Sequence, residues 1–254
     1  MELVKDIFAY VWEGQGNNCN SYALRYSVDG KAKYALIDPG HEVVTTPMMD
    51  PRNRRAVRIY EEPGMDALVA QLQKDGIALK DIGLLVNTHG HIDHCDASFE
   101  LAATTGARVA LHEKDKDMCN KSIMDVLGID IGQKKEKKER VPDLYLQEGE
   151  LRLGKPDPIV LEIIHTPGHS PGSVSIYWAE KKTLIAGDVV FYRSTGRWDL
   201  PGGDLGLLKQ SIARLAKLDC ELLLAGHPYG HPGIIKGKKE IQTNFSFILH
   251  QMLI

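Results

Sequence analysis

Three histidines and one aspartate lie within six residues, in the segment His89-Gly90-His91-Ile92-Asp93-His94. Imidazole nitrogens and carboxylate oxygens bind zinc and similar divalent cations at about 2.0–2.2 Å. His89 and His91 are two positions apart, so both side chains can point the same way from an extended loop. Asp93 and His94 are adjacent and could serve a second cation. A histidine-rich turn without metal is the alternative, but this pattern arises by chance in roughly one chain of this size in a thousand.

Three later segments carry the same types of ligand. The turn His165-Thr166-Pro167-Gly168-His169-Ser170 contains two histidines, Asp188 follows Gly187, and His227 follows Gly226. Each segment comes directly after an apolar run that we interpret as a strand, and α/β proteins place their sites at the carboxyl ends of strands. Taken singly, each of these residues is more often structural than a ligand. Together with His89 to His94, they predict one site built from four distant segments.

The elements that must position these residues are predicted from hydrophobic patterns. Ile82 to Val86 is a buried strand directly before the histidine-rich segment, Ala97 to Ala103 has a helical pattern, and Arg108 to Leu111 is again a strand. This alternation predicts an α/β fold. Asp204 can cap a helix with an apolar face at Leu205, Leu208, Ile212 and Leu215. The other expected strands are Val11–Trp12, Ser21–Tyr26, Tyr34–Ile37, Ile159–Ile164, Ser173–Trp178, Thr183–Ala186 and Glu221–Ala225, and the other expected helices are Met65–Lys74 and Lys236–Leu253.

Two segments do not fit this alternation. Residues His41 to Gly64 contain three prolines and many charges, so we expect a loop or insertion near the mouth of the site, as a lid or a dimer contact. Lys134 to Arg140, with the sequence KKEKKER, is interpreted as a solvated mixed-charge run rather than a binding patch.

Composition favours a soluble globular protein. The chain has 254 residues, 43% of them apolar and 26% charged, and no linker divides it, so a single domain over residues 1–254 is expected. The net charge of −3, without a strongly basic stretch, argues against nucleic acid as a partner. We see no signal peptide and no run of 18 apolar residues, so no membrane segment is expected. Four scattered cysteines without a CxxC pair are not a disulfide scaffold, which favours the cytoplasm.

The chain resembles the metallo-β-lactamase superfamily, and within it the glyoxalase II-like hydrolases. The resemblance runs from Asn17 to about Tyr229 and includes NNCNSY, ALIDPG, THGHIDH, HTPGHSPGS, AGDVVF, GRWDLPGGD and AGHPYG. It implies a four-layered αββα sandwich that holds two divalent metal ions. Zinc is the first choice of metal, and iron or manganese also suits histidine and aspartate ligands without cysteine.

The resemblance also implies which residues bind the metals. One ion would be held by His89, His91 and His169, the second by Asp93, His94 and His227, and Asp188 would bridge the two. Asp38 matches a family position that supports the metal loop. His165 and Cys95 match no ligand position, and His165 is interpreted as a supporting or structural residue.

By resemblance, the expected reaction is hydrolysis of a thioester or ester carbonyl by a hydroxide that bridges the two metals. Asp93, a ligand beside that hydroxide, could orient it or shuttle a proton, which makes it the expected catalytic residue. Arg197 occupies the place of a basic glutathione contact, and Tyr229 matches a family tyrosine, so both are expected to bind substrate. Asp199 departs from the family pattern, where tyrosine is common. The segment after His227 is too short for the helical C-terminal domain that completes the thiol site in long members, so recognition of glutathione stays open.

Three other functions stay open. An iron-dependent persulfide dioxygenase has similar motifs but uses one iron, which here would be held by His169, Asp188 and either His89 or His91. A lactonase or a nucleic-acid phosphodiesterase is less favoured, and no extra nucleic-acid-binding domain is evident. Antibiotic hydrolysis is disfavoured because Asp188 stands where the most familiar β-lactamases have cysteine. The oligomeric state is also open, and a homo-oligomer is compatible with the sequence.

Overall fold

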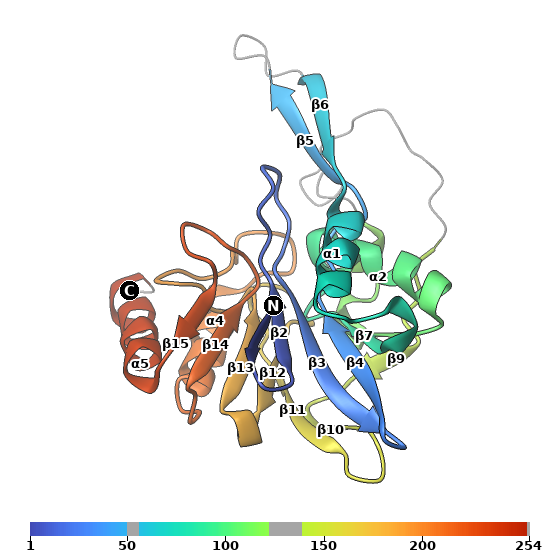
Figure 1. Cartoon of the computed structure of the whole chain (residues 1–254). Helices are drawn as coiled ribbons and strands as arrows, with labels where there is room; N and C mark the ends of the chain where they lie inside the picture. The colour runs from blue at the N-terminus through green and yellow to red at the C-terminus, as the bar shows by residue number, and fades with distance from the viewer. Residues whose placement is uncertain (50–55, 122–138, 253–254) are drawn as a thin grey trace.

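Two β-sheets lie face to face, with helices covering the outer face of each (Figure 1). This computed structural model describes residues 1–49, 56–121 and 139–252. The order of layers is helix, sheet, sheet, helix, which confirms the predicted αββα sandwich. The mixed-charge run 134–140 lies outside the described residues except for Glu139 and Arg140.

The first sheet has seven strands in the order β1-β2-β3-β4-β7-β8-β9. The strands β1 to β4 are antiparallel neighbours, whereas β4, β7, β8 and β9 run parallel, so their carboxyl ends meet at one edge of the sheet. Their bounds are β1 Glu2–Val4, β2 Ile7–Tyr10, β3 Ser21–Val28, β4 Lys31–Ile37, β7 Ile82–Val86, β8 Arg108–His112 and β9 Leu144–Leu146. The expected strand at Val11–Trp12 is wrong, because the strand ends at Tyr10 and the chain leaves the sheet there.

The second sheet has six strands in the order β10-β11-β12-β13-β14-β15. Two neighbouring strands of this sheet, β13 and β14, run parallel, so the residues that follow them emerge side by side. The bounds are β10 Gly149–Leu153, β11 Ile159–His165, β12 Val174–Trp178, β13 Thr183–Gly187, β14 Leu222–Ala225 and β15 Ile234–Lys236. Short 3-10 turns, η1 Leu79–Asp81, η2 Glu113–Asp115, η3 Met118–Asn120 and η4 Ala179–Lys181, join several elements.

Three apolar layers hold the sandwich together. Alternate strand residues such as Leu24, Ile37 and Ile176 fill the space between the sheets. The outer faces pack against α1 Gly64–Lys74 and α2 Ile92–Thr105 on the first sheet, and against α4 Leu205–Leu215 and α5 Lys238–Phe247 on the second. Burial of each such large apolar side chain stabilises the fold by about 1.5–3 kcal/mol. This packing holds the strand ends, which polar residues follow, in fixed positions.

Two helix starts differ in how well they could be predicted. The predicted cap of α4 is confirmed, since the Asp204 carboxylate accepts a hydrogen bond of 2.9 Å from the backbone N–H of Leu207. Helix α2 begins at Ile92 rather than at Ala97, so Asp93 and His94 lie in its first turn. The residue before that turn is His91, which makes no side-chain capping bond and therefore leaves no start signal in the sequence.

Residues His41 to Gly64 were expected to form a loop or an insertion, and the loop is wrong because two strands pair within the segment. They contain an antiparallel hairpin of β5 Val44–Met49 and β6 Ala56–Glu62, which projects beyond the sandwich (Figure 1). A two-stranded ribbon has only edge strands, so it can accept a proline within β5. The last described element is a π-helical turn, η5 Ile248–Met252. Among the described residues, none of the helices has the length and apolar character needed to traverse a bilayer.

Candidate metal centre

Seven potential ligands come together where strands of both sheets end. Six of them are buried, and Asp93 is partly exposed. They are His89 and His91 after β7, Asp93 and His94 in the first turn of α2, His169 after β11, Asp188 after β13, and His227 after β14. The structure thus brings together all seven residues that the sequence suggested as ligands.

The first group consists of His89, His91 and His169. Nδ1 of His91 lies 2.9 Å from Nε2 of His169, which in turn lies 3.2 Å from Nε2 of His89. Each ligand atom of this group is within 4.8 Å of the others. Three nitrogens from two loops therefore face a common point, at the spacing that a bound cation requires.

The second group consists of Asp93, His94 and His227. Nε2 of His94 lies 3.1 Å from Nε2 of His227, which lies 3.4 Å from Oδ2 of Asp93. Asp188 stands between the two groups: its Oδ1 is 3.3 Å from His94, and its Oδ2 is 3.5 Å from His169. A carboxylate in that position can reach both groups at once, as a bridging ligand must.

The second ring nitrogen of most of these histidines has a partner outside the cluster. Metal-binding histidines commonly use that nitrogen to fix the tautomer and the ring orientation. Oδ2 of Asp38, for example, lies 2.9 Å from Nδ1 of His94. The other partners of Nδ1 are Thr88 Oγ1 for His89 at 3.1 Å, the Arg197 carbonyl for His169 at 2.6 Å, and the Asn18 carbonyl for His227 at 2.9 Å.

Two polar atoms at the site lack a hydrogen-bond partner. They are Oδ1 of Asp188, whose 3.3 Å approach to His94 lacks hydrogen-bond geometry, and Nε2 of His91, both buried. A buried polar atom without a partner costs roughly 1–3 kcal/mol, so such atoms need a further explanation. A cation beside the Asp188 oxygen would supply one. The donor set of imidazoles and carboxylates without sulfur fits zinc, iron or manganese.

Burial and neighbouring charges set the protonation of these side chains. Burial lowers the pKa of His91 to about 4, with a further contribution from the adjacent His169 ring. Burial likewise holds the pKa of His89 well below its ordinary value. Burial alone would raise the pKa of Asp188, but His227 and His94 outweigh it and keep that pKa well below 3.8. At pH 7 His89 and His91 are therefore neutral and Asp188 is ionised, which are the forms that bind metal. For His227, burial lowers the pKa, but Asp188 and Asp93 outweigh it and raise the pKa to about 9, so metal binding there would release a proton.

Asp115 is a buried residue that sequence reasoning missed. Its carboxylate accepts hydrogen bonds from the backbone N–H of Gly90 at 2.9 Å, the Ser170 hydroxyl at 2.6 Å and the backbone N–H of Gly172 at 2.6 Å. It thus ties the loop of His89 and His91 to the loop of His169. A Cβ at Gly90 or Gly172 would lie within 3.0 Å of Asp115 atoms, so both positions need glycine for this close approach. An aspartate between Lys114 and Lys116 carries no motif that would reveal this role.

The remaining residues singled out in the sequence lie outside the two ligand groups. His165 stacks on His112 with the ring centres 4.5 Å apart, and its Nε2 lies 2.9 Å from the Pro171 carbonyl. Cys95 is buried against Leu111 and Cys119. Arg197 pairs with Asp199 through two hydrogen bonds of 2.9 and 2.8 Å. Tyr229 stacks on the His227 ring at 4.6 Å.

Similarity to known proteins agrees with this geometry. The sequence profile of the metallo-beta-lactamase superfamily matches residues 14–227. A probable metallo-hydrolase of Methanocaldococcus jannaschii is 32% identical over 219 residues, which cover 84% of this chain and 89% of that protein. Hydroxyacylglutathione hydrolase GloC of Haemophilus influenzae is 33% identical over 177 residues, covering 65% of this chain and 77% of that protein.

Two solved structures have a similar fold. The crystal structure of the BLEG-1 B3 metallo-beta-lactamase superposes with a TM-score of 0.68 at 26% identity, covering 94% of this chain and 97% of that one. TTHA1623 in a di-iron-bound form gives a TM-score of 0.61 at 29% identity, covering 87% of this chain and 91% of that one.

Proposed function

The chain belongs to the metallo-β-lactamase superfamily, and from that premise we propose that it is a hydrolase of thioester or ester carbonyls that uses two metal ions. The observation that carries the proposal is the position of Asp188 between two groups of three potential ligands. One ion would be held by His89, His91 and His169, and the other by Asp93, His94 and His227. Such a pair of cations polarises a carbonyl and lowers the pKa of water to about 7.

The side chains around the site have roles of their own in this proposal. Asp93 lies at the open side of the cluster, where its ionised carboxylate can orient a water or accept its proton. The hydrogen bonds that the rings of His94, His89 and His227 make with Asp38, Thr88 and the Asn18 carbonyl keep these rings from rotating. Preorganised side chains of this kind lower the barrier because no rearrangement is needed during the reaction.

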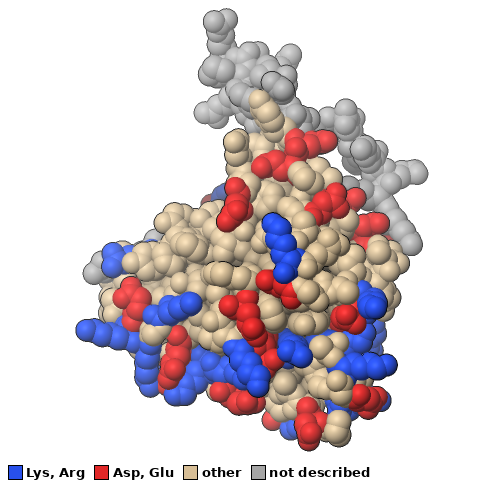
Figure 2. Space-filling model, in the orientation of Figure 1, with Lys and Arg blue, Asp and Glu red and all other residues tan. Residues whose placement is uncertain are grey.

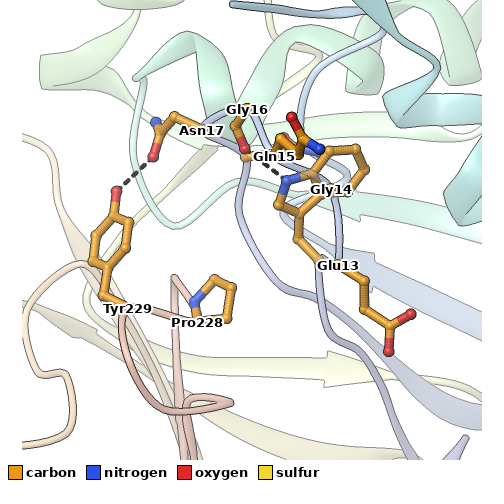
Figure 3. Close-up of a pocket in the computed structure, with 9 residues that line it drawn as sticks. Glu13, Gly14, Gln15, Gly16, Asn17, Pro228 and Tyr229 are labelled. Carbon is orange, nitrogen blue, oxygen red and sulfur yellow. Dashed lines mark hydrogen bonds between the residues drawn. The ribbon is translucent and has the colours of Figure 1, made fainter.

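A cavity of about 380 Å³ beside the cluster could take the substrate. It lies between the loop Trp12–Asn18 and the turn that carries Pro228 and Tyr229 (Figure 3). Glu13 is the only charged side chain among its lining residues. The volume suits a small molecule. On the face shown in Figure 2, the described charged residues nearest the hairpin are mainly Asp and Glu, whereas Lys and Arg mixed with Asp and Glu cover the lower part of the molecule.

Metal analysis and a substrate panel test this proposal together. The protein should contain close to two metal ions per chain and hydrolyse simple acyl thioesters or esters faster than lactones and phosphodiesters. Removal of the metal with a chelator should abolish the activity, and added zinc, iron or manganese should restore it. A fully active metal-free preparation would reject the proposal. Uptake of oxygen with glutathione persulfide, at one iron per chain, would instead favour the dioxygenase.

A further inference from the structure

The inserted hairpin contacts the loop that forms one wall of the cavity. The contact is made by Glu62, the last residue of β6. Its carboxylate accepts hydrogen bonds from the backbone N–H of Gln15 at 3.0 and 3.1 Å and from the backbone N–H of Gly16 at 2.7 Å. Hydrogen bonds to a charged acceptor are stronger than those between neutral groups. One side chain therefore fixes two successive amides of a loop that lies outside both sheets.

Close packing supports the same contact. A Cβ added at Gly16 would collide with the side chains of Val44 and Thr46 in β5, so the loop backbone lies directly against the hairpin. On the other side, the indole N–H of Trp12 donates a hydrogen bond of 2.7 Å to the Gly16 carbonyl. The hairpin, Gly16 and Trp12 thus form one continuous wall.

The next residue in the loop links this wall to the ligand cluster. The Asn17 side chain accepts a hydrogen bond of 2.6 Å from the Tyr229 hydroxyl (Figure 3). Its amide nitrogen donates a hydrogen bond of 2.6 Å to Oδ2 of Asp93. The Tyr229 hydroxyl determines which end of the Asn17 amide faces Asp93, because that amide must present its oxygen to the hydroxyl.

We propose that the β5–β6 hairpin shapes the substrate cavity, and that Glu62 is its positioning residue. Glu62 holds Gln15 and Gly16, which places Trp12 and Asn17 along the cavity and beside Asp93. The hairpin therefore contributes to substrate specificity through this loop, and none of its described side chains hydrogen-bonds to a proposed metal ligand. The kinetic part of this inference rests on the proposed hydrolase function, whereas the structural part does not.

Two variants of Glu62 and one matched control test the proposal. Glu62→Ala removes all three acceptor contacts, and Glu62→Gln keeps a single acceptor oxygen. The control is Glu61→Gln, because neighbouring strand residues point to opposite faces of the hairpin. Amide hydrogen exchange at Gln15 and Gly16, metal content, and steady-state kinetics with the best substrate are measured for each protein.

In Glu62→Ala, amide hydrogen exchange at Gln15 and Gly16 should become about tenfold faster or more, because the lost hydrogen bonds had protected these amides from exchange. KM should rise several-fold while kcat and metal content stay close to those of the parent protein, as expected when ground-state and transition-state binding weaken equally. Glu62→Gln should be intermediate, and Glu61→Gln should match the parent.

Unchanged exchange in Glu62→Ala would overturn the inference whatever the activity. Faster exchange with an unchanged KM would overturn the role in the cavity. Loss of metal in Glu62→Ala would also overturn it, since the hairpin would then support the ligands themselves. A parent protein that hydrolyses nothing in the panel would reject the proposed function, and the exchange data would still decide whether Glu62 holds the loop.

Discussion

Oδ2 of Asp38 lies 2.9 Å from Nδ1 of His94, and both side chains are buried. The same carboxylate accepts hydrogen bonds of 2.7 Å from the backbone N–H and from the hydroxyl of Thr88. Asp38 therefore orients one proposed ligand and fixes the backbone directly before another, His89. The resemblance implied that Asp38 supports the metal loop, and these hydrogen bonds are contacts through which it can do so.

Asp38→Asn is expected to weaken metal binding about tenfold or more, because the carboxamide has one acceptor oxygen where Asp38 uses two. Asparagine also tolerates the left-handed backbone at this position, where φ is 49°. Competition with a coloured chelator measures the affinity. Asp157→Asn, a change at an exposed carboxylate, is the control. Equal affinities in the two variants would contradict a supporting role for Asp38.

Asp188→Ala is expected to remove one or both metals and to lower hydrolysis by at least about 100-fold. The reason is that Asp188 is the only side chain of the seven whose two oxygens face both ligand groups. Elemental analysis of the purified variant gives the stoichiometry. A bridging role would be refuted by metal content and rate equal to those of the parent protein.

The two histidines of the His165–Ser170 turn should differ in their effects. His169→Ala removes an imidazole from the ligand cluster, whereas His165→Ala removes a ring stacked on His112. We expect a larger loss of metal and activity in His169→Ala, by about tenfold or more. The opposite order would mean that the wrong histidine has been assigned as a ligand.

The metal-free protein should be most stable near pH 6.5. The pKa of His91 is about 4 in the folded protein, so the unfolded chain binds a proton first as the pH falls from 6.5 to 4, and stability decreases by up to about 3 kcal/mol. For His227, burial lowers the pKa, but Asp188 and Asp93 outweigh it and raise the pKa to about 9. The stabilisation from protonated His227 is fully present below pH 6.5 and is lost as the pH rises through 9.

Urea unfolding of chelator-treated protein at pH 4.5, 6.5 and 9.5 tests this profile. His91→Ala should flatten the acid side of the profile, and His227→Ala the alkaline side. If the acid side keeps its slope in His91→Ala, another group is responsible for it.

Asp199 should limit the use of Arg197 in substrate binding. The Nε and Nη2 groups of Arg197 both donate hydrogen bonds to the Asp199 carboxylate, and the two side chains are 61% and 53% exposed. Asp199→Asn should free the guanidinium and raise kcat/KM for a glutathione thioester relative to one with an uncharged thiol. Arg197→Ala should remove that gain when it is added to Asp199→Asn. An unchanged substrate preference in Asp199→Asn would argue against glutathione contact by Arg197.

Much of the fold could be predicted from local patterns. The strands β7 and β13 and the cap of α4 lie within one residue of their expected bounds, because apolar runs and a capping aspartate act over short distances. The hairpin β5–β6 could not be predicted, since its prolines and charges are typical of loops and its stability depends on pairing within a ribbon. The start of α2 was missed because His91 offers no capping side chain.

In the candidate site, too, local features could be predicted and long-range contacts could not. Its ligand types were evident because histidines and aspartates follow apolar runs directly. The links from Asn17 to Asp93, from Glu62 to Gly16 and from Asp115 to Gly90 could not be inferred, because each joins residues whose proximity arises only from the folded chain. Spacing along the sequence carries no information about such contacts when neither partner belongs to a motif.

The buried position of Asp115 has a consequence for protein design. A peptide or scaffold that copies only His89 to His94 would lack the carboxylate that fastens this turn to the His169 loop. Transplanting the centre into another framework would therefore require Asp115, Gly90 and Gly172 to be moved with the ligands as one set.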